Sequence, residues 1–319
     1  MGKENHLASV QGVSPKSAKG FTAGLKPPSA LGLRRLAESS PEPDKAFRLT
    51  RIEERRLVAA ARAGDRRALD RLLRLLAGPI YRFGRGFCGD PHDAEDVAQV
   101  VLAALARTLN EFRGEASLTT WAYTVARHTC ARQRRRGVHA PARLVSLESD
   151  RAGAAIAVAD PAGDPHHALE RSELRGAIER AIHALPAAQR EVLVLRDVEG
   201  LSAREVGKVL RLSERAVKSR LHRARLAVRS ALEPHHDGRP PARRSKGCPD
   251  TARMVSRFLE GELDAEHCAR LEAHVRGCPD CRRACDTLRL ALTACRARRR
   301  ESAPRAVVRV ARAALATTE

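Results

Sequence analysis

The stretch that decides the fold is LSAREVGKVLRLSERAVKSRLHRAR, residues 201–225. Ser202 is followed three residues later by Glu205. This spacing predicts a capping box, in which the serine oxygen accepts from a backbone N–H and the glutamate reaches back to the helix start. Ser213 is a second N-cap signal, and Arg211-Leu212 lies between the two predicted helices. The stretch therefore predicts a short helix, a tight turn and a longer second helix.

The second of these helices is predicted to be amphipathic and basic. Val217, Leu221, Ala224 and Val228 recur at the spacing of a buried helix face. The other face is predicted to display Arg215, Lys218, Ser219, Arg220, His222, Arg223 and Arg225. A helix-turn-helix protein offers such a basic second helix to the major groove of DNA, where it contacts phosphates and base edges. The alternative is a solvated basic face on a surface helix.

The rest of the chain predicts an all-α protein made of several small domains. Apolar residues make up 43% of the 319 residues and aromatic residues only 3%, so Leu, Val, Ile and Ala must build the cores. These residues recur at helical spacing, and alternating strand-like runs are scarce. We expect two small helical domains joined by a linker, followed by a small helical metal-binding domain. Each block taken alone is also compatible with an ordinary helical bundle.

Composition shifts and breaker residues divide the chain into seven segments. We expect a disordered tail, a helical block, a linker, a second helical block, a second linker, a cysteine-rich block and a basic tail, at residues 1–48, 49–136, 137–167, 168–232, 233–247, 248–295 and 296–319.

The charge of the chain favours a polyanionic partner. The formal net charge is +21, and arginine outnumbers lysine 51 to 8. Residues 66–136 and 168–232 each carry a net charge of +6, so both helical blocks are basic. Nucleic acid and an anionic membrane surface are both candidates. No apolar run reaches the ~18 residues of a membrane span, and residues 1–40 lack an apolar signal segment, so we expect a cytoplasmic protein.

The second helical block resembles region 4 of the extracytoplasmic-function (ECF) sigma factors. The resemblance is carried by LPAAQREVLVL at 185–195, EGLS at 199–202 and VKSRLHRAR at 217–225. In that family this domain reads the −35 promoter element, which implies DNA contacts by Arg215, Lys218, Ser219, His222 and Arg223. Arg211 departs from the glycine that is common at this turn, where the backbone is often left-handed.

The first helical block resembles region 2 of the same family. DAEDVAQVV at 93–101 is similar to the helix that docks on polymerase, which implies polymerase contacts by Asp93, Asp96 and Gln99. FRGEASLTTWAYTVAR at 112–127 is similar to the segment that captures a flipped base of the −10 element. The implied −10 contacts are Arg113, Thr119, Trp121, Arg127, Arg134 and Arg135. For Trp121 the favoured interpretation is a core aromatic residue on a helix, and direct stacking on a base is the alternative. The resemblance implies core RNA polymerase and promoter DNA as partners, and no enzymatic activity.

Six of the eight cysteines lie between positions 248 and 295. His274 and Cys278 are four residues apart across an expected helix end, Cys281 follows, and Cys248 can complete a tetrahedral set. Three sulfurs and one imidazole are typical of a structural zinc site.

The pattern, with FLEGEL at 258–263, resembles the zinc-binding anti-sigma fold, which is usually a separate protein that holds its sigma factor inactive. We therefore expect bound zinc and an intramolecular contact with the sigma domains. The alternative is a domain that zinc only stabilises and that has no regulatory role.

The remaining cysteines allow several interpretations. Cys268, Cys285 and Cys295 could exchange with the zinc ligands on oxidation, bind a second thiophilic metal, or act as small buried apolar residues. Cys88 and Cys130 are interpreted as packing residues.

The preferred hypothesis is an ECF sigma factor tuned by its own zinc domain in response to metal or redox stress. One alternative is a metal- or redox-responsive helix-turn-helix regulator that acts without polymerase. Another is a zinc enzyme acting on nucleic acid, which would need an open metal position.

Overall fold

The structure is a computed structural model that describes residues 50–88, 90–114, 116–139, 165–234 and 248–316. Over these residues the chain forms helices and no strands, which confirms the predicted all-α fold. The predicted tail at 1–48 and most of the linkers at 137–167 and 233–247 lie outside the described residues. No helix among those described is long and apolar enough to cross a membrane.

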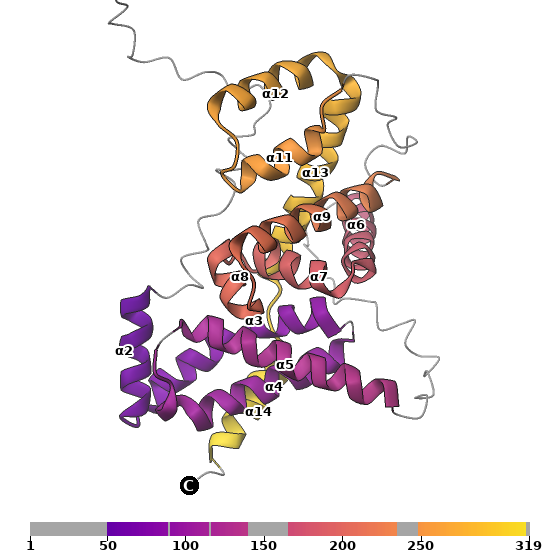
Figure 1. The fold of residues 1–319 in the computed structure, drawn as a ribbon. Helices are drawn as coiled ribbons and strands as arrows, with labels where there is room; N and C mark the ends of the chain where they lie inside the picture. The colour runs from indigo at the N-terminus through magenta and orange to yellow at the C-terminus, as the bar shows by residue number, and fades with distance from the viewer. Residues whose placement is uncertain (1–49, 89, 115, 140–164, 235–247, 317–319) are drawn as a thin grey trace, which may run out of the picture.

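The first helical block comprises α2 (Arg51–Arg62), α3 (Arg66–Cys88), α4 (Pro91–Thr108), a 3₁₀ turn (Leu109–Glu111) and α5 (Leu118–His139). Helix α3 packs against α2, α4 and α5, and these helices lie together at the indigo-to-magenta end of the molecule (Figure 1). The Phe83 ring meets the edge of Tyr123 at a centroid distance of 5.6 Å, with both rings buried. Apolar side chains of α3, α4 and α5 thus form one core.

The second helical block comprises α6 (Pro165–Ala184), α7 (Ala187–Leu193), a π-helical turn (Val194–Val198), α8 (Ala203–Leu210) and α9 (Glu214–Leu232). The predicted capping box is confirmed, because Ser202 Oγ accepts from the Glu205 N–H at 3.2 Å and Glu205 Oε2 accepts from the Ser202 N–H at 2.7 Å. Ser213 caps α9 as predicted. Arg211 has φ 56° and ψ 50°, so the turn is left-handed despite its arginine.

The two helical blocks share a single hydrophobic core. Arg82 of α3 donates to both carboxylate oxygens of Glu199, each at 2.9 Å, and the Tyr123 hydroxyl donates to the same carboxylate at 2.9 Å. Closer to α7, Arg127 Nε donates to Glu191 Oε1 at 2.8 Å. The blocks are therefore packed against one another through buried polar contacts as well as apolar ones.

The cysteine-rich domain, residues 248–297, consists of α11 (Thr251–Leu259), α12 (Ala265–Gly277) and α13 (Pro279–Ala297). It has a small core of its own around Val255, Leu271 and Leu288. Helix α13 also contacts α9 and the π-helical turn, and it runs from this domain down to the two helical blocks (Figure 1).

Residues 296–319, interpreted above as a basic tail, contain a further helix. After a 3₁₀ turn (Arg298–Arg300), α14 (Arg305–Ala316) packs on α4 and α3 and buries Val307 completely. The chain thus returns from the cysteine-rich domain to the first helical block.

Candidate metal centre and nucleic-acid interface

The four predicted metal ligands come together at the junction of three helix ends. One ligand atom from each of Cys248, His274, Cys278 and Cys281 lies within 4.8 Å of all the others. The Cys248 and Cys278 sulfurs are 3.8 Å apart, and His274 Nε2 is 3.1 Å from Cys281 Sγ. Two sulfurs bound at ~2.3 Å to a tetrahedral zinc would lie about 3.8 Å apart. The donor set and its spacing therefore fit a four-coordinate metal with no open position.

Local helix signals place these ligands. Asp250, two residues after Cys248, caps α11, and His274 lies in the last turn of α12. The Cys278 N–H donates to the His274 carbonyl at 3.0 Å, and α13 starts at Pro279. Backbone donation from Cys281 lowers the pKa of Cys278, whereas burial and the neighbouring thiols raise the pKa of Cys281 to about 12. Metal binding would have to release the Cys281 proton, which couples metal affinity to pH.

The three spare cysteines lie outside this cluster. Cys268 is half-buried on α12, and burial raises the pKa of its thiol. Cys285 and Cys295 are buried on α13, and burial raises their pKa values to about 11 and about 12. All three are therefore weak nucleophiles at neutral pH, and their redox or second-metal role stays a prediction.

The predicted −35 contacts all lie on α9, but they are not equally accessible. Arg215, Ser219 and Arg223 are exposed, whereas Lys218 and His222 are half-buried. Lys218 Nζ lies 3.2 Å from Glu262 Oε1, and the same group donates to the Glu260 carbonyl at 3.4 Å.

His222 faces the same domain. Burial lowers its pKa, and the nearby Arg253 guanidinium lowers it further. Two of the five predicted −35 contacts are therefore partly covered by the cysteine-rich domain.

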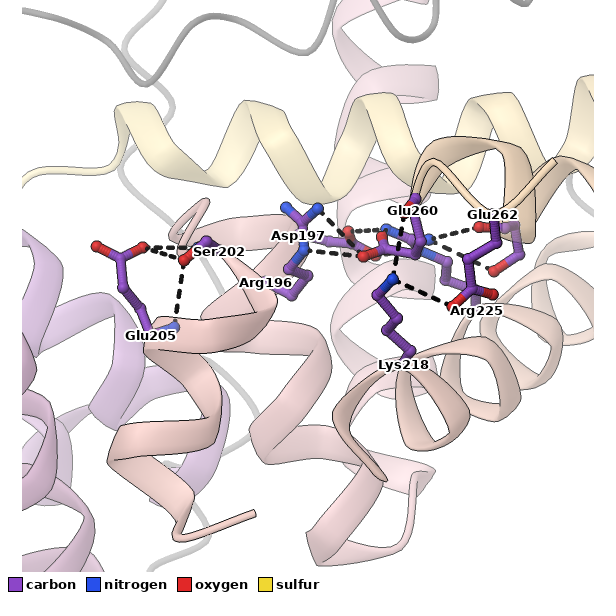
Figure 2. A network of polar contacts seen from close by, with 9 residues as sticks. Arg196, Asp197, Ser202, Glu205, Lys218, Arg225, Glu260 and Glu262 are labelled. Carbon is purple, nitrogen blue, oxygen red and sulfur yellow. Dashed lines mark hydrogen bonds and ion pairs between the residues drawn. The ribbon is translucent and has the colours of Figure 1, made fainter. Parts of the chain in front are cut away.

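Arg225 corrects one prediction, because its side chain is only 3% exposed and is not on the open basic face of α9. It binds Asp197 through two hydrogen bonds of 2.6 and 2.8 Å and Glu260 at 3.0 Å. Burial alone would lower the pKa of Arg225, but the two carboxylates raise it. Arg196 reaches the second Glu260 oxygen at 3.2 Å. Figure 2 shows this network joining α9, the π-helical turn and the loop after α11.

A cavity of about 250 Å³ lies at the start of the segment that is predicted to capture a flipped base, beside Phe112 and Arg113. It is lined by α2 and by the loop after α4, including Glu54, Val58, Arg62, Phe112, Arg113 and Ser117. Helix α2 holds the loop, because Arg62 Nε donates to the Leu109 carbonyl at 2.9 Å and Glu54 accepts from the Leu118 N–H at 2.9 Å. Sequence reasoning missed this role of α2. The capping box formed by Thr50 and Glu53 was the available signal for the helix.

The other predicted −10 contacts are spread along α5. Thr119 and Trp121 are half-buried, and Trp121 packs against the main core. Arg127 turns to the second helical block, where it pairs with Glu191. Arg135 is exposed near the end of α5, and the Arg134 side chain lies outside the described residues. The structure thus brings Arg113 to the cavity but directs Arg127 elsewhere.

The predicted polymerase contacts lie on α4. Asp96 is exposed, and Asp93 and Gln99 are half-buried. Asp90 caps the helix by accepting from the His92 N–H at 2.6 Å.

Comparison with known proteins identifies each part of this arrangement. Residues 70–139 match the family model "Sigma-70 region 2", residues 175–228 match "Sigma-70, region 4", and residues 248–282 match "Putative zinc-finger".

Several curated relatives match a large part of this chain. The RNA polymerase sigma-H factor of Pseudomonas aeruginosa is 32% identical over 187 residues, which cover 58% of this chain and 97% of that protein. The ECF RNA polymerase sigma factor SigM of Mycobacterium tuberculosis is 31% identical, with 55% of this chain and 83% of that protein covered. The ECF RNA polymerase sigma-E factor of Escherichia coli is 30% identical, with 44% and 75% covered. The chain therefore belongs to the extracytoplasmic-function sigma factors of RNA polymerase, which initiate transcription and are not enzymes.

Proposed function

We propose that this sigma factor is held in a closed, inactive form by its own cysteine-rich domain, which binds zinc. In the active form, Arg215, Lys218, Ser219, His222 and Arg223 would contact the −35 element. Asp93, Asp96 and Gln99 would contact core polymerase, and the loop around Arg113 would receive a −10 base. Because its partner is core RNA polymerase, we place the protein in the cytoplasm.

The contact between Lys218 and Glu262 is the observation that carries this proposal. A lysine that pairs with a carboxylate at 3.2 Å cannot neutralise a DNA phosphate at the same time. Glu260 and Glu262 also bring negative charge to the edge of the helix that would approach the DNA backbone. The cysteine-rich domain therefore opposes DNA binding by occupying basic groups and by repelling phosphates.

The packing of the two helical blocks supports the same closed form. The −10 and −35 elements are roughly 25 base pairs apart, which is about 85 Å along the DNA axis. In the structure the two blocks share one core and are joined by the buried pair of Arg82 and Glu199. They must separate before each can reach its own promoter element.

Helix α14 adds a third restraint. It packs along α4, the helix that carries the predicted polymerase contacts. Because α14 follows the cysteine-rich domain directly, displacement of that domain would pull on α14 as well.

Zinc binding would contribute to the folding free energy of the cysteine-rich domain. The core of the cysteine-rich domain is small, and a four-ligand metal site stabilises such a unit directly. Loss or exchange of the metal would weaken the domain and shift the equilibrium toward the open form. We propose metal or redox stress as the signal that does this. A helix-turn-helix regulator without polymerase is disfavoured, because it leaves the region 2 match unexplained.

Run-off transcription on total genomic DNA tests the proposal without a known promoter. Core polymerase is supplied with the full chain or with a chain ending at Gly247, and the transcript 5′ ends are mapped. The shortened chain retains the residues that match sigma-70 regions 2 and 4. We expect defined start sites with the shortened chain and few with the full chain. Equal output from both would refute autoinhibition.

A further inference from the structure

Two cysteines of the first helical block lie in direct contact. Cys88 is the last residue of α3, and Cys130 lies within α5. Their sulfurs are 2.7 Å apart, although the residues are 42 positions apart in sequence. Non-bonded heavy atoms pack best at about 3.5–4.0 Å, and a disulfide bond measures about 2.04 Å. The two sulfurs are therefore closer than non-bonded atoms ordinarily pack. Their separation needs to shorten by only about 0.7 Å to reach the length of a disulfide bond.

We propose that Cys88 and Cys130 are a redox modification site, which a hydroperoxide closes to an intramolecular disulfide. Neither residue forms a disulfide bond in the structure, and neither belongs to the metal cluster. The site can therefore be tested whether or not the cysteine-rich domain regulates transcription.

The burial of the two thiols assigns their roles. Cys88 is half-buried and can be reached by a small oxidant, whereas Cys130 is completely buried. The Cys88 sulfur would attack the peroxide, forming an S–O bond, breaking the O–O bond and releasing water or an alcohol. Cys130 would then attack the sulfenic sulfur, forming the S–S bond and breaking the S–O bond. The Cys130 proton leaves with that oxygen as water. The pair loses two electrons and the peroxide gains them, and a thiol reductant reverses the change.

The position of the pair gives the disulfide a structural consequence. The Phe87 carbonyl, next to Cys88, accepts from Arg190 at 3.5 Å. Arg127, one turn before Cys130, pairs with Glu191. Both partners lie on α7, so the pair lies between two contacts that join the helical blocks. A bond here would tie α3 to α5 beside that interface and stabilise the first block against unfolding.

Peptide mapping of the full, zinc-loaded chain tests the site. The protein is treated with hydrogen peroxide, alkylated with N-ethylmaleimide under denaturing conditions, digested without reductant and analysed by mass spectrometry. We expect the peptide with Cys88 linked to the peptide with Cys130, lighter than the two free peptides by two hydrogens. The thermal midpoint of the oxidised protein should rise by several degrees and return when dithiothreitol is added.

Two variants make the test specific. Cys88→Ser replaces a half-buried side chain and should abolish both the linked peptide and the thermal shift. Cys268→Ser changes a cysteine outside the pair and should keep both. The proposal is overturned if both thiols remain fully alkylated after oxidation. It is equally overturned if Cys88 links to another cysteine or accumulates as sulfinic acid without a link.

Discussion

Arg82 donates two hydrogen bonds to the carboxylate of Glu199, and the side chains of both residues are less than 5% exposed. This pair joins region 2 to region 4, and the Tyr123 hydroxyl donates to the same carboxylate. Both charges are out of water, so each depends on the other for compensation. The interface between the two regions therefore contains a buried polar network, formed by Arg82, Glu199 and Tyr123, in addition to its apolar core.

Removing the Glu199 carboxylate should strongly destabilise the packed arrangement of the two regions. Glu199→Ala leaves Arg82 buried without its anion and should cost about 3–5 kcal/mol. Tyr123→Phe removes one hydrogen bond to a charged group and should cost about 1.5–3 kcal/mol. Urea unfolding followed by circular dichroism measures both. If Tyr123→Phe lowered the free energy of unfolding as much as Glu199→Ala or more, Glu199 would not be the central residue of this network.

Removing a metal ligand should separate the zinc site from the sigma fold. Cys248→Ser deletes one of four ligands and should lower the zinc content of the purified chain severalfold, because the described residues place no fifth ligand in the cluster. Hydrogen exchange in α11 and α12 should rise, since the metal contributes folding energy. Cys268→Ser is the matched control and should retain zinc. Full zinc content in Cys248→Ser would show that the site is assigned wrongly.

Replacing Arg211 with glycine in the turn between α8 and α9 should stabilise the fold. Arg211 adopts a left-handed backbone, which costs a side chain with a Cβ about 1–2 kcal/mol. Arg211→Gly removes this strain and loses some chain entropy, so we expect a net gain of about 1 kcal/mol in the free energy of unfolding. Arg223→Gly, at an exposed position within α9, should instead lose about 1 kcal/mol. Urea midpoints that move in the same direction for both variants would argue against backbone strain at Arg211.

Docking of α11 on α9 should weaken in mild acid. Burial and Arg253 lower the pKa of His222 in the closed form, while Asp250 opposes this and Arg225 and Arg257 add to it. A histidine whose pKa is lowered on docking favours docking while neutral. That contribution is complete above the ordinary pKa of about 6.5 and is lost as the pH falls below it.

Hydrogen exchange in α11, corrected for the intrinsic effect of pH, measures this dependence. Protection should fall as the pH is lowered from about 6.5 to 5.5, and His222→Gln should reduce the dependence while leaving any zinc loss unchanged. The same loss of protection in His222→Gln as in the natural chain would assign the effect to other groups.

Local features of the fold could be predicted from the sequence because they depend on neighbouring residues. The Ser202–Glu205 capping box, the Ser213 cap and the left-handed turn each involve residues within one helix turn. The metal cluster was also predictable, because three of its ligands lie within eight residues of one another.

Features that depend on distant partners were not predictable in this way. Arg225 lies four residues after Leu221, at the edge of the apolar face, and only its charge assigns it to the basic face. Asp197 and Glu260 approach it from other elements and bury it. The contact of Cys88 with Cys130 and the packing of α14 on α4 likewise require the tertiary arrangement of helices. A helical period identifies which side of a helix is apolar, but it does not identify what covers the polar side.

The most direct test of the central claim keeps the whole chain and changes only the carboxylates that meet α9. Glu260→Gln with Glu262→Gln preserves side-chain size, leaves Asp197 on Arg225 and leaves the metal ligands intact. Glu266→Gln, on an exposed position of α12, is the control. Run-off transcription on genomic DNA with core polymerase should give severalfold more transcript from the double variant than from the natural chain, at equal zinc content and from the start sites used by the chain ending at Gly247. Output no higher than that of the natural chain, from a double variant that holds its zinc, would contradict the claim that these contacts keep the sigma factor closed.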